Sequence, residues 1–256
     1  MKEAFFAAAD GAYRPLEQSR GYWKRDSLHG RCVVGLLGYE MERLHGVPGF
    51  VPARLSVDMH SLAPFAPVRI ETKLVREGNR LRLVEAVMMA DGVEQARAQL
   101  LLLRAGEAPP GRTWAPEPWQ VPSPDSITPY PDPAGVRMFD WRPISGDLRT
   151  FGPRQVWSRE YHALVEGVEL TPWARIALHA DFASPWTHAG DAGIQYINCD
   201  VVLHIHRLPV GEWIGMEATG HEASQAIAVG HSRVYDEEGP LGHVSITALA
   251  NRKRRP

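Results

Sequence analysis

Four side chains that could do chemistry alternate along one short stretch, YINCDVVLHIHRLP at residues 196–209. They are the amide of Asn198, the carboxylate of Asp200 and the imidazoles of His204 and His206. Because the side chains of a β-strand point alternately to its two faces, a strand here would place all four on one face. An amide can orient a water molecule or a carbonyl group, and a carboxylate can accept a proton or orient its neighbours. The end with Asn198 and Asp200 is therefore a candidate wall of a reactive cleft; the alternative is a pair of hydrogen-bonding residues that hold a turn.

The two histidines could ligate a metal, because imidazole is a common metal ligand and His204 and His206 share a face. Catalytic zinc normally has three protein ligands, and the sequence offers no third ligand at a recognisable spacing. We therefore expect no metal and no organic cofactor. The histidines are predicted to lie on the sheet face away from the helix, in an interface or under a proline-rich segment, with hydrogen bonds to their rings.

Two helix ends carry further candidates. Asp181 follows the apolar residues 176–178 near the end of a helical stretch, so partial burial and a raised pKa are expected; a carboxylate that caps the helix is the alternative. Gly30 and Arg31 begin another helix, where free N–H groups and the helix dipole favour a developing negative charge. His29 precedes them. In the alternative interpretation, Gly30 is an ordinary helix-start residue and His29 lies on the surface.

A repeated pattern of elements must position these candidates. Apolar residues at helical spacing predict helices over residues 28–44 and 171–183, the second with Thr171 as its cap and Pro172 in its first turn. Four strand-like stretches follow each helix, separated by turn signals such as Gly-Asn and Asp-Gly. These strands are expected at residues 53–62, 68–77, 80–90, 94–103, 197–206, 213–221, 225–236 and 241–250. A shift of 145 residues superimposes the two sets without a gap, which predicts an internal duplication.

Prolines dominate residues 105–133, which have neither a helical nor an alternating period. Proline removes a backbone donor and restricts the residue before it, so this segment is predicted to be a linker. The two units are then expected at residues 1–104 and 134–256. Three aromatic residues predict that the linker packs along the surface: Trp114, Trp119 and Tyr130.

The composition is that of an ordinary globular protein, with 44% hydrophobic residues, 23% charged residues and a net charge of -2. This balance argues against partners such as nucleic acid or a membrane surface, and the basic run at residues 252–255 is interpreted as a solvated end. The apolar stretch near the N-terminus is too short for a signal peptide or a membrane span. We therefore expect a cytoplasmic protein in which Cys32 and Cys199, the only cysteines, are reduced.

The chain resembles the acyl-CoA thioesterase II family and its thioesterase-like relatives, which have a double hotdog fold. The resemblance rests on LHGRCVVG (28–35), on HADFASPW around Asp181, on YINCDVVLHIHRLPVGEWIG (196–215) and on SRVYDEEGPLGH (232–243). It implies an α+β fold with two helix-plus-antiparallel-sheet units in one chain. It also implies an acyl-CoA substrate whose thioester is attacked by water without a covalent intermediate.

By this resemblance Asp181 falls on the aspartate that the family uses as a base. Asn198 falls where the family has threonine or serine, and Ile246-Thr247 stands about where the family has glutamine. Asp181, Asn198 and Thr247 are therefore the catalytic candidates, although strand alternation makes Thr247 equally a strand filler.

The predicted function is acyl-CoA hydrolysis to a free acid and coenzyme A. His29, Gly30 and Arg31 would contact the substrate, with exposed N–H groups at the oxyanion, and Asp200 would line the same cleft. Hotdog units tend to associate, so a homodimer is expected. One alternative is a non-catalytic hotdog protein that binds acyl-CoA or another apolar ligand, or that serves only in assembly; another is a hydratase or dehydratase using His29.

Overall fold

The computed structural model describes residues 3–115, 117, 119–131 and 139–251. The basic run at 252–255 and the predicted boundary between linker and second unit, at 133–134, lie outside the described residues. Within the described part, no helix is both long enough and apolar enough to cross a membrane.

The protein is built from two units, each with a helix against a four-stranded antiparallel sheet. The first unit consists of α1 (Gly30–His45), β3 (Phe50–Met59), β4 (Val68–Glu77), β5 (Leu81–Ala90) and β6 (Val93–Arg104). The second consists of α2 (Pro172–Ala180), β12 (Tyr196–Asn198), β13 (Asp200–Ile205), β14 (Trp213–Ser224), β15 (Ile227–Asp236) and β16 (Gly239–Ala250). The strand order is β4-β5-β6-β3 in one unit and β14-β15-β16-β13 in the other. The offset of 145 residues recurs in the elements, since β4 begins at Val68 and β14 at Trp213.

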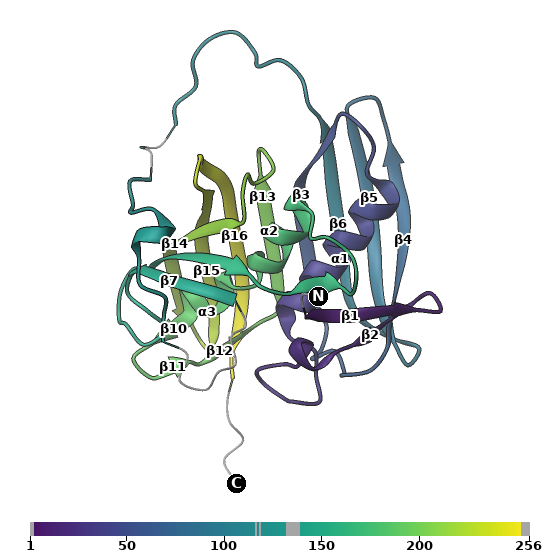
Figure 1. The fold of residues 1–256 in the computed structure, drawn as a ribbon, viewed down its shortest axis with the longest axis horizontal. Coiled ribbons are helices and arrows are strands. Elements are labelled where there is room, and N and C mark those ends of the chain that lie inside the picture. Colours follow the sequence, from purple (N-terminus) through teal and green to yellow (C-terminus); the bar gives the residue numbers. More distant parts are fainter. Residues whose placement is uncertain (1–2, 116, 118, 132–138, 252–256) are drawn as a thin grey trace.

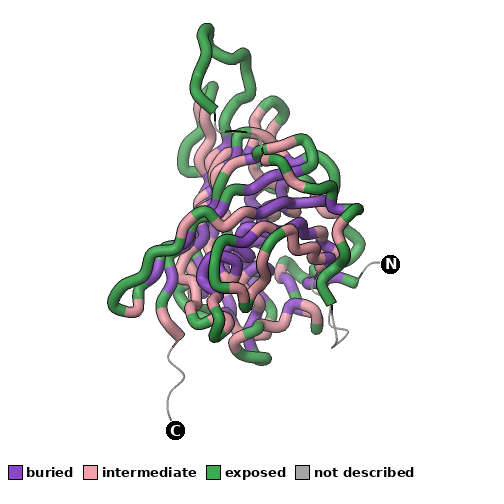
Figure 2. Tube along the Cα trace, turned by 90° about the vertical axis from the view of Figure 1, so that its left-hand side faces the viewer, coloured by how far each residue is buried: buried purple, intermediate pink, exposed green. Residues whose placement is uncertain are grey.

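The two units join edge to edge through β3 and β13, which pair antiparallel from Asp200 opposite Asp58 to His204 opposite Arg54. This pairing joins the two four-stranded sheets, which form one continuous sheet of 14 strands together with β12 and further strands at both edges. The sheet curves around α1 and α2, which lie side by side at its centre (Figure 1). Buried residues gather where these helices meet the sheet, as the purple tube in Figure 2 shows.

The helices approach closely because α1 presents glycines to α2. A Cβ atom on Gly35 would lie 2.6 Å from Leu178 Cδ2, and one on Gly38 would lie 3.0 Å from Ala177 Cβ. The carbonyl oxygen of Gly38 accepts a hydrogen bond of 3.0 Å from the indole N–H of Trp173. Small residues at these positions therefore set the distance between the two helices.

Replacing Gly35 by valine is expected to destabilise the protein by about 1–3 kcal/mol, because the new side chain overpacks against the buried Leu178. Urea unfolding measures this loss. The matched control is Gly106→Val in the linker, where no atom lies within 4 Å of the added Cβ. Equal stability of the two variants would contradict a tight helix contact.

Side chains link the start of α2 to the last turns of α1. Thr171 caps α2 by accepting a 3.1 Å hydrogen bond from the N–H of Ala174. Its hydroxyl donates to Glu42 Oε2 on α1 at 2.7 Å. Pro172 occupies the first turn of α2, as predicted.

The helix predicted over 171–183 is α2, which ends at Ala180, and a second helix that was not predicted, α3 (Ala183–His188), follows it. Pro185 explains the break, because it has no N–H to donate to the carbonyl of Asp181 and its ring would clash with that carbonyl in a continuous helix. The N–H of Ser184 donates to Asp181 O instead, at 3.0 Å. Asp181 is therefore placed at a joint between two helices.

Short strands that the sequence did not predict extend both edges of the sheet. They are β1 (Ala4–Ala9), β2 (Ala12–Pro15), β7 (Phe139–Ser145), β8 (Gln155–Glu160) and β9 (Ala163–Val165). β10 (Ala189–Gly190) and β11 (Gly193–Ile194) form a separate two-stranded sheet. β2 continues the sheet beyond β4, and β8 continues it beyond β14. β9 crosses from the second unit to pair parallel with β1, which ties the two units together.

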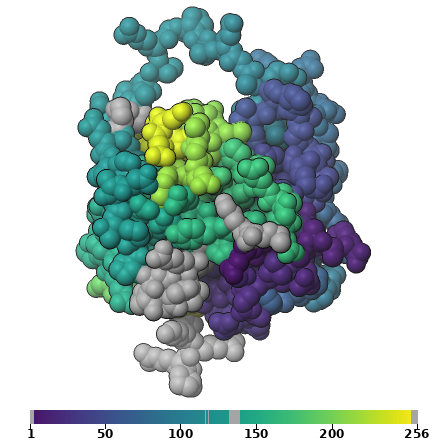
Figure 3. Space-filling model, viewed as in Figure 1, coloured from purple at the N-terminus to yellow at the C-terminus, as the bar shows by residue number. Residues whose placement is uncertain are grey.

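No helix or strand forms in the described residues of the linker before the short 3-10 turn η2 (Pro124–Ser126). Its first part arches away from the body (Figure 3), and Trp114 there is 85% exposed. Later residues pack as predicted. Trp119 stacks on Tyr235 with ring centroids 4.1 Å apart, and Tyr130 stacks on Trp141 at 4.7 Å. The unit boundaries at 104 and 134 stay predictions.

A β-bulge interrupts the stretch that carries Asn198, Asp200 and the two histidines, between β12 and β13. Asn198 opposes Ala248 on β16 and Val202 opposes Ser245, so the three residues 199–201 stand opposite two residues. One extra residue reverses which side chains face the helices. Asn198 faces inward before the bulge and the buried Val201 faces inward after it.

This corrects the expectation that all four polar side chains share a face. Asp200 and His204 lie on the outer face, opposite to Asn198. His204 stacks on His243 with centroids 4.8 Å apart, and His206 Nε2 is 3.0 Å from Pro240 O. The histidines are thus on the face away from the helices, as predicted. Among the described residues, no group of three His, Cys, Asp or Glu side chains could hold a metal ion.

Candidate active site

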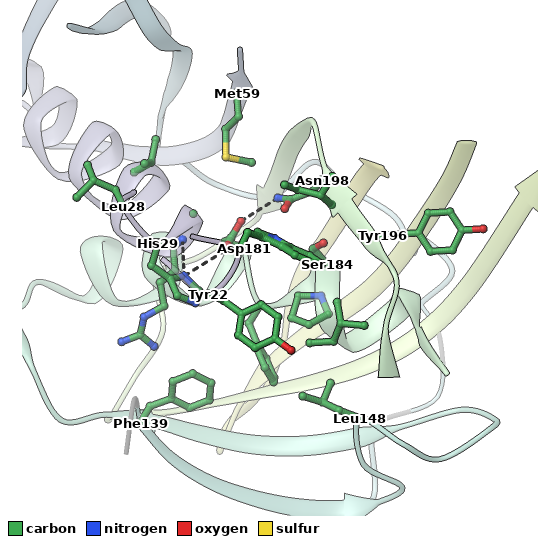
Figure 4. Close-up of a pocket in the computed structure, with 18 of the residues that line it drawn as sticks. Tyr22, Leu28, His29, Met59, Phe139, Leu148, Asp181, Ser184, Tyr196 and Asn198 are labelled. Atoms are coloured by element: carbon green, nitrogen blue, oxygen red, sulfur yellow. Dashed lines mark hydrogen bonds and ion pairs between the residues drawn. The ribbon is translucent and has the colours of Figure 1, made fainter. Parts of the chain in front are cut away.

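A cavity of about 500 Å³ opens where the two units meet. It is bounded by the start of α1, the end of β3, the joint between α2 and α3, and β12 (Figure 4). Its walls are mainly apolar and aromatic, and include Leu28, Met59, Phe139, Trp141, Phe182 and Tyr196. A pocket of this size and lining suits the apolar part of a small ligand.

Two carboxylates line this cavity, and one of them, Asp140, is paired with Arg142 and Arg159. The other, Asp181, is only 5% exposed, and its Oδ1 accepts a hydrogen bond of 2.8 Å from the amide of Asn198. Gly30, at the first position of α1, lets the carboxylate lie against the helix start, because a Cβ there would be 2.8 Å from Asp181 Oδ1. The side chain that can act as a base thus comes from one unit and the helix start from the other.

Burial raises the pKa of Asp181, because the charged form loses its hydration. The hydrogen bond from Asn198, the positive charge of Arg31 and a hydrogen bond from the Arg31 backbone N–H oppose this effect in part. The result is a carboxylate that is more basic than usual. A raised pKa is what a carboxylate needs to act as a general base near neutral pH.

His29 caps α1 beside Asp181. Its Nδ1 accepts a hydrogen bond of 3.3 Å from the N–H of Arg31 and lies 3.9 Å from Asp181 Oδ2. Burial lowers the pKa of His29 to about 3. The ring is therefore neutral at physiological pH and adds no positive charge beside Asp181.

The guanidinium of Arg31 points away from the carboxylate and into a buried ion pair. Its Nη2 is 2.6 Å from Glu160 Oε2. Its Cζ lies over the rings of Phe5 and Phe139, at 4.8 and 4.9 Å from the ring centroids. Burial alone would raise the pKa of Glu160, but the charge of Arg31 and hydrogen bonds from His162 lower it to about 2. This pair fixes the start of α1 against β8.

Each of the two units matches the model of a protein-family domain. The model of the acyl-CoA thioesterase N-terminal domain matches residues 19–103, and that of the acyl-CoA thioesterase C-terminal domain matches residues 106–248. The chain belongs to the acyl-CoA thioesterase family. A search of the curated proteins finds no match.

Solved structures confirm the double hotdog fold of this acyl-CoA thioesterase family member. A conserved protein of unknown function with a hot dog fold from Alicyclobacillus acidocaldarius has a TM-score of 0.78 at 16% identity, over 98% of this chain and 97% of that one. The tesB protein of Mycobacterium avium subs paratuberculosis has a TM-score of 0.71 at 14% identity, over 96% of each chain. The acyl-CoA thioesterase II TesB2 of Mycobacterium marinum has a TM-score of 0.67 at 14% identity, over 97% and 96%.

The structure of this family member brings five of the seven predicted site residues to the cavity. These are His29, Gly30, Arg31, Asp181 and Asn198. The other two, Asp200 and Thr247, do not line it.

The positions of Asp200 and Thr247 correct the prediction that they share the cleft. The bulge turns Asp200 to the outer face, where its Oδ1 accepts a hydrogen bond of 2.5 Å from the backbone N–H of Thr247. Thr247 is exposed on the same outer face, opposite Val229 of β15. Neither side chain can therefore reach a water molecule bound at Asp181.

Sequence analysis missed Glu160 and Ser184 among the polar residues of the site. Glu160 belongs to a strand that was not predicted, so no signal pointed to it. Ser184 lines the cavity three residues after Asp181. Pro185, four residues after Asp181, is a signal that could have located the helix joint and with it this serine.

Proposed function

We propose that the protein hydrolyses an acyl-CoA thioester to a free acid and coenzyme A, with Asp181 as the base that activates water. Membership of the acyl-CoA thioesterase family supports a thioester hydrolase in general. The observation that carries the mechanism is the buried carboxylate of Asp181, held by Asn198 against the start of α1 in an apolar cavity.

The reaction uses groups already in place. Asp181 removes a proton from a water molecule as the water oxygen bonds to the thioester carbon. The carbonyl oxygen becomes negative and is stabilised at the start of α1, where the N–H of Gly30 has no partner within the helix. The intermediate then collapses, the C–S bond breaks, and Asp181 returns its proton to the sulfur of coenzyme A.

Asn198 takes the place of a hydroxyl residue in this scheme. Its amide N–H donates to Asp181 Oδ1 at 2.8 Å, which fixes the carboxylate that accepts the proton of water. The amide also favours the ionised form of Asp181, since its hydrogen bond lowers the pKa of that carboxyl. Asn198 therefore positions the base.

The aromatic wall of the cavity defines the place of the acyl group. Phe182 packs edge-to-face with Phe139 and with Trp141, at centroid distances of 5.1 and 5.5 Å, and the rings of Phe139 and Trp141 are tilted at 6.4 Å. Burying apolar acyl carbons against such a surface contributes binding energy in proportion to the area covered. The hydrophilic part of coenzyme A is left for the mouth of the cavity.

Thiol release measured over short, medium and long acyl-CoAs tests the proposed activity. Release of coenzyme A from at least one of them is expected. Binding of acyl-CoA without release from any substrate would instead support a non-catalytic binding protein.

Replacing Asn198 by alanine is expected to move the acidic limb of the kcat/KM profile to higher pH. The lost hydrogen bond lowers the pKa of Asp181 in the wild type, so its removal raises that pKa, and the base is then ionised only at higher pH. At the pH optimum of the wild type, kcat/KM should fall at least about tenfold, as expected for a hydrogen bond to a charged group. Asn79→Ala, in the turn between β4 and β5, is the control and should leave the profile in place.

A further inference from the structure

Ser184 is a second polar group on the wall that holds Asp181. It lies in the first turn of α3, lines the cavity and is only 3% exposed. Its backbone N–H donates to the carbonyl of Asp181 at 3.0 Å, which fixes the two residues relative to each other. Figure 4 shows Ser184 on the same side of the cavity as Asp181 and Asn198.

The hydroxyl of Ser184 differs from those of other buried serines in its hydrogen bonding and in its place at the cavity. Among the described residues, no hydrogen bond involves Ser184 Oγ, whereas the hydroxyl of Ser158 donates to the carbonyl of Ile214 at 3.1 Å. Ser232 Oγ also has no partner, but it is sealed in the protein and does not line the cavity. Ser184, by contrast, lines the cavity.

A hydroxyl in such a place needs a partner from the cavity itself. An unpartnered buried hydroxyl is destabilising, so a bound water or ligand atom must satisfy it. Asp181 accepts one proton of an attacking water, so the other O–H of that water needs a second acceptor. Besides the amide oxygen of Asn198, whose N–H is used on Asp181, the hydroxyl oxygen of Ser184 is a side-chain acceptor on this wall.

We propose that Ser184 Oγ accepts this second hydrogen bond and so orients the water that Asp181 activates. With one O–H on Asp181 and the other on Ser184, the lone pair of the water points to the thioester carbon. Ser184 forms no covalent bond and its own proton stays in place. This inference rests on the proposed function and adds a water-orienting residue to it.

Ser184→Ala and Ser232→Ala form a matched pair that tests the role. Neither hydroxyl has a hydrogen-bond partner among the described protein residues, so neither variant should lower the melting temperature. In Ser184→Ala, kcat should fall about tenfold or more while KM changes less than about twofold, because only the orientation of water is lost. The acidic limb of the pH profile should not move, since Ser184 has no part in the pKa shift of Asp181. Ser232→Ala should keep the kcat of the wild type.

The outcomes separate this inference from the proposed function. A wild type that releases no thiol from any acyl-CoA overturns both. A wild type that turns over, with Ser184→Ala at the same kcat, overturns the role of Ser184 alone. An equal loss of kcat in Ser232→Ala, or a lower melting temperature in Ser184→Ala, assigns the hydroxyl to packing and also overturns it.

Discussion

Asp181→Asn is expected to abolish thiol release while leaving the protein at least as stable as the wild type. Asparagine has nearly the same shape but cannot accept a proton from water, so turnover should fall at least about 100-fold. Loss of activity together with unchanged or higher stability distinguishes a functional carboxylate from a structural one.

The stability part of this prediction follows from the sign of the pKa shift. The folded pKa of Asp181 is raised, so the folded state binds this proton more tightly than the unfolded state does. The ionised carboxylate therefore lowers stability above its unfolded pKa, increasingly as pH rises through the folded pKa. Asp181→Asn should be more stable than the wild type at neutral pH, and the difference should vanish in acid.

Thermal unfolding at several pH values and thiol release, both on the same preparations, measure this result. Asp200→Asn is the matched control, because Asp200 is on the same segment of chain but faces away from the cavity. The control should keep its turnover. If Asp181→Asn retained more than about a tenth of wild-type activity, a base at this position would be excluded.

Glu160→Gln is expected to cause the largest loss of stability, about 3–5 kcal/mol, because it removes the negative charge from a buried ion pair with Arg31. The folded pKa of Glu160 is lowered to about 2, so its contribution is present above its unfolded pKa, near 4.5, and is lost as pH falls toward 2. Wild type should therefore lose stability over that interval, and the variant should lack this part of the acid dependence.

Urea unfolding between pH 2 and 7 measures both effects. Glu17→Gln is the control, since Glu17 pairs with Arg20 and Arg25 on the surface, where solvent screens the charges and ion pairs contribute little to stability. Equal losses in the two variants would contradict a dominant role for the buried pair.

Most of the repeated architecture could be predicted because its signals are local. Periods of two and of 3.6 residues, and turns such as Gly78-Asn79 and Asp91-Gly92, depend only on neighbouring residues. The edge strands β1, β2, β7 and β8 were missed because they are short and are ordered by the strands beside them. Pairing partners of this kind are not visible in a local pattern.

Part of the site could also be predicted from local signals, and part of it depends on strand pairing. The resemblance and the apolar residues before Asp181 indicated a buried carboxylate, and the structure places it in the cavity. The bulge at 199–201 depends on the register with β16, so the change of face between Asn198 and Asp200 could not be read from alternation. The sequence did contain a signal for the direction of Thr247. Val244 and Ile246 are apolar and two residues apart, so their side chains point to the inner face of the sheet. The side chain of Thr247, next to Ile246, must then point to the outer face.

The antiparallel helix pair has two ends, and a dimer of identical units would form the same junction at both. Here the carboxylate of Asp181 meets an open helix start at Gly30, whereas at the opposite end Pro172 has no N–H to present and Thr171 is tied to Glu42. Joining the copies in one polypeptide let each junction change independently. Under the proposed mechanism, one junction holds the reacting groups and the other only links the two helices, so the described residues carry one such site although the units are duplicated.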